Sequence, residues 1–473
     1  MNFKMCALLG GLLAVAGCVH YQPQPLKPEQ SAAQYESRRL DDPALKAFIT
    51  TNSGVAPAAW PLEKWDLNSL TFAAFYFHPD LAVARAQWNV AEAGVMTAGA
   101  RPNPSVTFTP AYDTQIPDNP SPWIIPVSLD IPIETAGKRA KRIAQAEQAA
   151  ESARYSFISA AWQIRSGVRA SLLQYRLAGR REELLQKQFE VQTNIVRLLQ
   201  EQYDAGAIAR QELTIAQIAL HKTQLDLSDA QSKQSDARSQ LAQALGVGLP
   251  AVDGIDLSYD FSMADVGTMS APEARRVALR ERADIRGALA DYAAAEASLE
   301  LEIAKQYPDL HLGPAYAWNN GNAADNEWSL GATLELPILD QNQGPIAEAK
   351  AQRKLSAAKF EAMQAQVIAQ IDRAVAGVRV AREQLVTAGK LLEAESQQVK
   401  SAETQLAAGA GERMDVLNAQ LESANAALTQ LDNEEKLQTA LGGLEDALQQ
   451  PADGIAAVIQ KISTETAKTK EAK

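Results

Sequence analysis

The chain has 473 residues, a formal net charge of −12 and an aromatic content of only 6%. Binding to nucleic-acid phosphates requires an excess of Lys and Arg, so this charge argues against a nucleic-acid partner. Both cysteines, Cys6 and Cys18, lie in the first twenty residues, which excludes a disulfide framework in the rest of the protein. The chain is rich in alanine, which favours helices.

The first residues have the pattern of a bacterial lipoprotein signal peptide. Lys4 precedes an apolar run that is too short for a comfortable membrane span, and small residues follow it. The stretch LAVAGC, which ends at Cys18, resembles a lipobox. This resemblance implies cleavage before Cys18 and a covalent diacylglycerol and N-acyl lipid on its side chain. The alternative is a plain signal peptide cut at Ala16 or Gly17, with an incidental cysteine.

Two copies of one unit fill most of the remaining chain. Pro104 and Pro308 are 204 residues apart and begin similar segments. Toward the end of each copy, LAQALG at 241–246 matches LQTALG at 437–442. Self-similarity at a nearly constant spacing indicates an internal duplication. The predicted layout is a signal peptide (1–17), a lipid-anchored arm (18–65), a first repeat (66–250), a joint (251–271), a second repeat (272–450) and a tail (451–473).

Each repeat contains two predicted strands, in which apolar and polar residues alternate. Between Trp328 and Leu336, for example, every second residue is apolar. The four strands are expected at about 104–112, 123–131, 308–318 and 327–336, as two hairpins. Isolated hairpins with one apolar face are marginal in water, and this pattern suits a membrane β-barrel. Four strands cannot close a barrel, so three chains with twelve strands are expected to share one.

The helical segments have an apolar period of seven, which is typical of a coiled-coil seam. In the second repeat the seam runs from Ile371 to Leu406 in steps of seven. In the first repeat, the helix from Gly137 to Tyr203 would be on the order of 100 Å long at ~1.5 Å per residue. The expected fold is therefore an α+β membrane protein, with a long α-helical coiled-coil barrel and four strands per chain.

The ordered set of motifs resembles the outer-membrane efflux protein family, the TolC-like channels. The resemblance covers about 66–450 and includes the duplicated unit, the Asn103-Pro104 and Tyr307–Leu310 strand entries and the two glycine turns. It implies a homotrimer with a 12-stranded outer-membrane barrel and a helical tunnel in the periplasm. Such a channel is the passive exit duct of a tripartite system, with an inner-membrane pump and a periplasmic adaptor as partners.

The cargo is left open by the sequence. The segment Leu336–Gln352 most resembles the branch that serves heavy-metal cation pumps of the resistance-nodulation-division type. A drug or organic-solute channel of the same fold is the first alternative, and a coiled-coil periplasmic lipoprotein adaptor is a distant one. No nucleophile elbow, phosphate loop or catalytic metal motif is present in the sequence. We therefore expect no enzyme activity and no cofactor.

The four histidines have no ligand spacing to one another, so no metal site is predicted. His311 is interpreted as a single polar side chain that lines the pore.

Two glycine turns form the predicted site. Glycine can take the left-handed conformation that ends a helix, and an acid in the next first turn suits the helix dipole. The resemblance places both turns at the periplasmic tip, where the tunnel closes and the adaptor docks. Acidic rings there would favour cations, and arginines could hold the gate closed. Helix capping is the alternative role of these charges. The predicted tip residues are Tyr203, Gly206, Arg210, Glu212, Gly409, Arg413 and Asp415.

Overall fold

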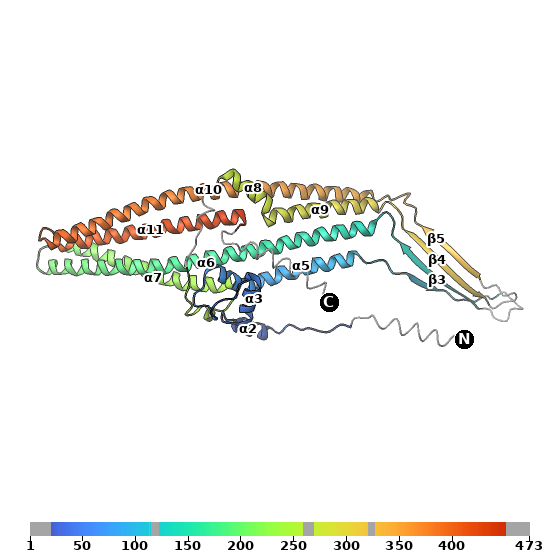
Figure 1. The fold of residues 1–473 in the computed structure, drawn as a ribbon, viewed down its shortest axis with the longest axis horizontal. Helices are drawn as coiled ribbons and strands as arrows, with labels where there is room; N and C mark the ends of the chain where they lie inside the picture. The colour runs from blue at the N-terminus through green and yellow to red at the C-terminus, as the bar shows by residue number, and fades with distance from the viewer. Residues whose placement is uncertain (1–19, 113, 115–122, 259–268, 320–326, 451–473) are drawn as a thin grey trace.

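The computed structural model describes residues 20–112, 114, 123–258, 269–319 and 327–450. The predicted signal peptide, the lipidation site Cys18, the tail over 451–473 and part of the joint lie outside these residues. The molecule is a long rod, with helices along most of its length and a sheet at one end (Figure 1). Among the described residues, no helix combines the length and apolar character needed to cross a membrane.

The largest apolar core lies near the middle of the rod. The N-terminal arm contains α2 (Pro28–Glu36) and α3 (Pro43–Ser53), and α3 packs against α4 (Leu67–Phe77). The short helix η1 (Leu249–Val252) contacts α7 (Arg210–Leu245). Large side chains such as Leu45, Trp65 and Leu70 are fully or almost fully buried here. The arm is therefore part of the folded body.

Each repeat is a short helix, a medium helix, a pair of strands and two long helices. The helices of the first repeat are α4, α5 (Pro79–Ala98), α6 (Lys138–Asp204) and α7 (Arg210–Leu245). Those of the second are α8 (Ala271–Glu281), α9 (Ala283–Ala304), α10 (Gln343–Ala407) and α11 (Arg413–Leu448). The 67 residues of α6 span ~100 Å.

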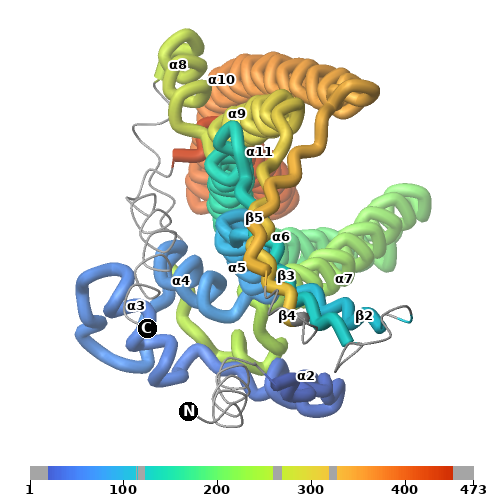
Figure 2. The backbone as a smooth tube through the Cα atoms, turned by 90° about the vertical axis from the view of Figure 1, so that its right-hand side faces the viewer, coloured from blue at the N-terminus to red at the C-terminus, as the bar shows by residue number. Residues whose placement is uncertain are grey.

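The long helices form a layer one helix thick. Helix α6 contacts α5, α7, α9 and α11, and α10 contacts α9 and α11. The layer order is therefore α5-α6-α9-α10 toward the sheet and α7-α6-α11-α10 toward the other end. Viewed from the sheet end, the layer follows an arc (Figure 2). Within one chain, Ile371 and Val378 of the predicted seam are buried, whereas Leu406 is 38% exposed.

The sheet is antiparallel and has the order β1-β3-β4-β5, with β2 also paired to β3. The strands are β1 (Ser105–Phe108), β2 (Ala111–Tyr112), β3 (Trp123–Ile133), β4 (Leu310–Asn319) and β5 (Glu327–Leu334). The first predicted strand is thus two segments, with Pro110 between them. Proline has no N–H to donate to a sheet, which explains the interruption.

The sequence match near the end of the repeats is wrong by one heptad. Helices α7 and α11 both have 36 residues and begin 203 residues apart. Position by position, Leu241 therefore corresponds to Leu444 and not to Leu437. The last residues of the two helices, Leu245 and Leu448, correspond in the same way. A heptad pattern matches itself when it is displaced by seven residues, which explains the error.

Candidate functional site

The sheet has one apolar and one polar face. The strand registers place cross-strand partners on the same face, and successive residues alternate between faces. The apolar face carries Val106, Phe108, Trp123, Ile125, Val127, Leu129, Ile131, Leu312, Tyr316, Trp318, Trp328, Leu330 and Leu334. The polar face carries small and polar residues, among them Ser105, Thr107, Ser128, Asp130, His311, Gly313, Ser329, Gly331 and Thr333.

The apolar face is unusually exposed. Trp328 is 78% exposed and Leu330 is 76% exposed. The cross-strand pairs Tyr112–Trp123 and Tyr316–Trp328 have ring centroids 5.2 and 4.6 Å apart. A contiguous exposed apolar surface marks a contact with another protein or with lipid.

Both edges of the sheet are open. Within the described part of the chain, β1 and β5 each pair with only one strand. An open edge presents unpaired N–H and C=O groups that can accept another strand. The sheet of a single chain is therefore incomplete.

The two glycine turns lie together at the end of the rod opposite the sheet (Figure 1). Gly206 and Gly409 both have φ +72°, so both take the left-handed conformation expected at the end of a helix. Helix α7 then begins at Arg210 and helix α11 at Arg413. Tyr203, in the last turn of α6, is 37% exposed.

The charged tip residues differ in their contacts. Asp415 completes a capping box at the start of α11, where its Oδ2 accepts from the backbone N–H of Glu412 at 3.0 Å. Glu212 is exposed in the first turn of α7, whose N-cap has no side-chain hydrogen bond. Among the residues with described positions, neither Arg210 nor Arg413 forms an ion pair. Their predicted latch would therefore require contacts between chains, and it stays a prediction.

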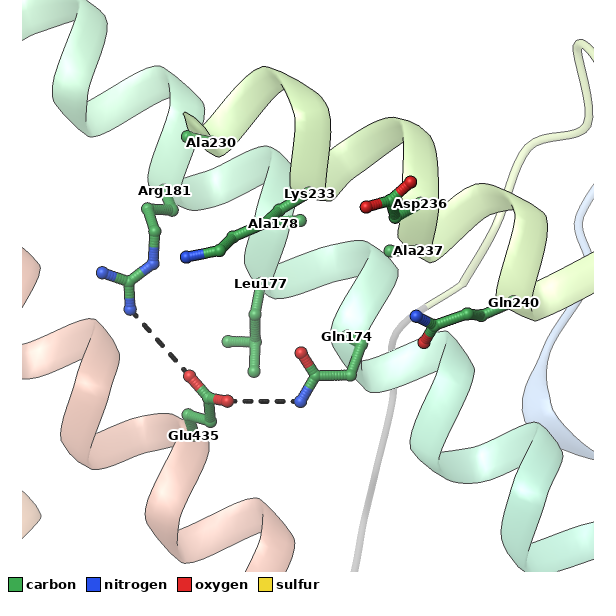
Figure 3. Close-up of a pocket in the computed structure, with 10 residues that line it drawn as sticks. All are labelled: Gln174, Leu177, Ala178, Arg181, Ala230, Lys233, Asp236, Ala237, Gln240 and Glu435. Atoms are coloured by element: carbon green, nitrogen blue, oxygen red, sulfur yellow. Dashed lines mark hydrogen bonds and ion pairs between the residues drawn. The ribbon is translucent and has the colours of Figure 1, made fainter. Parts of the chain in front are cut away.

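A polar cavity of about 450 Å³ lies between α6, α7 and α11. Figure 3 shows Gln174 and Arg181 of α6 directed toward Glu435 of α11, with Lys233 and Asp236 of α7 across the space. Gln174 Nε2 donates to Glu435 Oε1 at 3.2 Å, and Arg181 Nη2 lies 3.9 Å from Glu435 Oε2. This lining suits water and polar solutes better than an apolar ligand.

A buried charge cluster joins the two repeats. Arg165 Nη2 lies 2.7 Å from Glu445 Oε1, and Arg169 Nε lies 3.4 Å from Oε2 of the same carboxylate. Arg169 also donates to the backbone O of Gln438 at 3.1 Å, and a Cβ on Gly442 would lie 2.1 Å from its Nη1. Burial lowers the pKa of Arg169, and Glu445 opposes this change.

Sequence patterns did not indicate this cluster or the contact of His311 with Asp130. Both join residues that are distant in the chain, and spacing along the sequence cannot show such neighbours. The one available signal was Asp130, the single charged residue in β3. In the described ranges, no group of three or more His, Cys, Asp or Glu side chains is placed to hold a metal ion.

Comparisons with known proteins agree with this architecture. The family model described as outer membrane efflux protein matches residues 76–247 and 274–449. The chain is 26% identical over 270 residues to the cobalt-zinc-cadmium resistance protein CzcC of Cupriavidus metallidurans. That alignment covers 57% of this chain and 62% of the length of CzcC, which is less than two thirds of the relative.

Solved structures have the same fold. The outer membrane protein VceC of Vibrio cholerae superimposes with a TM-score of 0.65 at 18% identity, over 81% of this chain and 96% of VceC. CusC, whose crystal structures concern folding and transmembrane channel formation, gives a TM-score of 0.67 at 17% identity, over 84% of this chain and 95% of CusC. The duplicated helix and strand unit is thus a shared architecture.

Proposed function

The chain belongs to the outer membrane efflux protein family, and we propose that it is the outer-membrane channel subunit of a tripartite efflux system. Three chains would join their sheets into a 12-stranded barrel and their helical layers into a tunnel. The barrel would lie in the outer membrane and the tunnel in the periplasm. An inner-membrane pump and a periplasmic adaptor would deliver the cargo, and the channel would be a passive duct.

The observation that carries this proposal is the two-faced sheet with two open edges. An apolar face with exposed Trp328 and Leu330 suits lipid, and a polar face suits an aqueous lumen. The helical layer of one chain is also open at both borders, where α7 and α10 each have a long helix on one side only. Exposed apolar residues on α7 include Ile215, Ile218 and Leu225. Threefold closure would cover both kinds of edge.

The proposed lipid contact is tested by spin labels on adjacent residues of β5. Leu330→Cys places a label on the apolar face, and Ser329→Cys is the matched control on the polar face. In reconstituted vesicles, the label at 330 is expected to collide with oxygen and the label at 329 with a water-soluble nickel chelate. Equal access of the nickel chelate to both positions would contradict a barrel in lipid. A heat-modifiable trimer on gels provides a second test.

For the cargo, we propose divalent metal cations. The similarity to CzcC, whose name refers to cobalt, zinc and cadmium resistance, supports this choice. A deletion strain is expected to lose tolerance to these metals and to regain it with the intact gene. A loss of tolerance only to antibiotics would favour the drug-channel alternative.

The lipid on Cys18 is also a proposal, supported by the sequence LAVAGC alone. Mass spectrometry of the mature N-terminus tests it, with the Cys18→Ser variant as the control. An N-terminus without an acylated cysteine would contradict it.

We propose further that the tip is the gate, with Arg210 and Arg413 contacting acidic groups of neighbouring chains. Their exposure at the end of the rod, without an ion pair in their own described chain, supports this role. The double change to Ala is expected to open the resting pore, which planar-bilayer conductance would detect. An unchanged, mostly closed conductance excludes these two arginines as the latch.

A further inference from the structure

His311 and Asp130 form a pair across two strands of the polar face. Nδ1 of His311 lies 3.1 Å from both carboxylate oxygens of Asp130. His311 is the register partner of Pro132, and Asp130 precedes Pro132 by two residues, so both side chains lie on the same face. The side chains are 42% and 45% exposed. The pair is therefore accessible on the face that would line the lumen.

The surroundings leave this pair open. Gly313 and Gly331, which pair with each other next to it, have no side chains, and the register partners of Asp130 and His311 toward the two edges, Ser105 and Thr333, have short ones. The nearby carboxylate of Asp309 accepts from Lys138 Nζ at 2.8 Å and from the backbone N–H of Thr135 at 2.9 Å. Asp309 is thus engaged with groups at the start of α6, and Asp130 is the carboxylate that contacts the imidazole.

This arrangement is the one that prepares a histidine for a metal ion. A hydrogen bond from Nδ1–H to a carboxylate fixes the ring orientation and the tautomer, and it leaves the lone pair of Nε2 for the metal. Imidazole nitrogen suits zinc, copper and nickel. Because the described residues contain no larger group of ligands, water must complete the coordination. Such a site is weak, which allows an ion to enter and to leave.

We propose that His311, oriented by Asp130, is a weak binding site for divalent transition-metal ions on the polar face of the sheet. The proposal rests on the proposed function, because it assigns metal ions to the lumen of the channel. The corresponding residue of the first repeat, 204 positions earlier, is Thr107. The site therefore occurs once per chain. Asp130 is a positioning residue, and His311 is the ligand.

Channel recordings with ZnCl2 test the effect in the lumen. Rising concentrations of zinc are expected to reduce the wild-type conductance reversibly, with recovery after a chelator is added. His311→Ala removes the proposed ligand and is expected to need at least ~10-fold more zinc for the same reduction, because even the loss of a partner that only orients a ligand costs ~10–100-fold in affinity. His221→Ala is the matched control, because His221 is exposed on α7. Equal zinc sensitivity of wild type and His311→Ala would overturn the proposal.

Direct binding separates this inference from the channel function. Purified full-length protein with a histidine-free tag is titrated with Cu²⁺ and examined by electron paramagnetic resonance. Nitrogen coordination at low copper is expected in the wild type and in the His221→Ala variant, and a weaker signal is expected in His311→Ala, which retains the exposed His20 and His221. A signal that is unchanged in His311→Ala excludes the site, even if the protein forms no channel. Absent conductance together with a His311-dependent signal would instead contradict the channel and retain the site.

The role of Asp130 has its own test in the same titration. Asp130→Asn is expected to weaken copper binding by ~10-fold, because the amide holds the imidazole less firmly than the carboxylate does. Asp130→Glu, which retains the carboxylate, is expected to restore part of the affinity. An affinity that is unaffected by Asp130→Asn would remove Asp130 from the proposal.

Discussion

The two repeats have the same order of helices and strands, but equivalent helices are buried to different extents. Helices α4 and α8 each have 11 residues and precede a medium helix at equivalent positions. The first, α4, buries seven residues beneath the N-terminal arm, whereas α8 buries only Ala274 and Ala278. Arg275 instead joins α8 to Asp372 of α10 with contacts of 2.7 and 2.5 Å. Duplication preserved the path of the chain, while the surface of each copy adapted to different neighbours.

The ends of the last helices show the same divergence. Gly246 ends α7 with φ +71°, and a Cβ there would lie 2.7 Å from His78 Cα. The equivalent residue after α11, Gln449, has φ +49°, and its Oε1 accepts from the backbone N–H of Ala283 at 2.8 Å. In the first repeat, the end of α7 thus contacts the backbone at His78 directly, which only glycine permits. In the second repeat, the side chain of Gln449 makes the connection to the start of α9.

Arginines hold both of these helix ends. Arg38 of the arm donates Nη1 to the backbone O of Gly246 at 2.6 Å and to the backbone O of Phe77 at 2.7 Å. In the second repeat, Arg282 donates Nη1 to the backbone O of Ala447 at 2.8 Å. Arg282 occupies the sequence position of His78. The backbone carbonyl at the end of the last helix therefore accepts from an arginine of the N-terminal arm in the first repeat, and from an arginine of the repeat itself in the second.

The largest expected effect is at the cluster between the repeats. Glu445 is fully buried against two arginines, whereas the equivalent residue of α7 is Ala242. Glu445→Gln is expected to lower the free energy of unfolding by ~3–5 kcal/mol, because it leaves buried positive charge without its partner. Heat-induced loss of the helical circular dichroism signal in detergent measures this effect.

The matched control for that change is Glu434→Gln on the same helix. Glu434 lies 3.6 Å from Arg176 at a partly exposed site, and such pairs contribute ~0–1 kcal/mol. Equal shifts of the unfolding temperature in both variants would refute a special role for the buried cluster.

An intermediate effect is expected at the end of α7. Gly246→Ala adds the ~1–2 kcal/mol cost of left-handed backbone for an L-residue to ~1–3 kcal/mol of overpacking against His78. Gly254→Ala is the control, because Gly254 has φ +72° and an added Cβ there meets no atom within 4 Å. The same thermal measurement should rank the two variants in this order. A control variant as destabilised as Gly246→Ala would argue against the close contact.

The smallest expected effect is a pH dependence confined to the first repeat. Burial lowers the pKa of His78 from 6.5, Asp80 raises it and Arg38 lowers it further. The unfolded chain therefore binds the proton more readily, and the contribution of His78 to stability is present above pH 6.5 and decreases as pH falls below it. Hydrogen-exchange protection factors, which correct for the slower intrinsic exchange at lower pH, should fall at the joint between α4 and α5 from pH 7.5 to 5.5. Protection at the joint between α8 and α9, where Arg282 takes the place of His78, should change less, and an equal loss of protection at both joints would contradict this assignment.

Sequence patterns predicted the local elements well because each has a short period. Alternation in Trp328–Leu336 predicted a two-faced strand, and Gly206 and Gly409 predicted the ends of two helices, both of which the structure contains. The break at Pro110 could also have been anticipated, since proline cannot donate to a sheet.

Long-range neighbours were beyond the reach of these patterns. The contact of His311 with Asp130 depends on the register of β3 against β4, and the contact of Arg165 with Glu445 depends on how α6 lies on α11. A one-heptad displacement leaves the coiled-coil pattern unchanged, so the equivalence of Leu241 and Leu444 required the helix bounds. Sequence patterns therefore predicted contacts within one turn or strand, but they did not predict contacts between distant segments.

The open edges of the sheet have a consequence for genetics. In a barrel closed by strand pairing between subunits, every edge strand must pair with the edge strand of a neighbour. A subunit with a damaged β5 would therefore also leave the adjacent strand of its neighbour unpaired. Co-expression of such a subunit with the intact one should be dominant. If intact and damaged subunits are present in equal amounts and mix randomly, only ~1/8 of the trimers would contain three intact subunits.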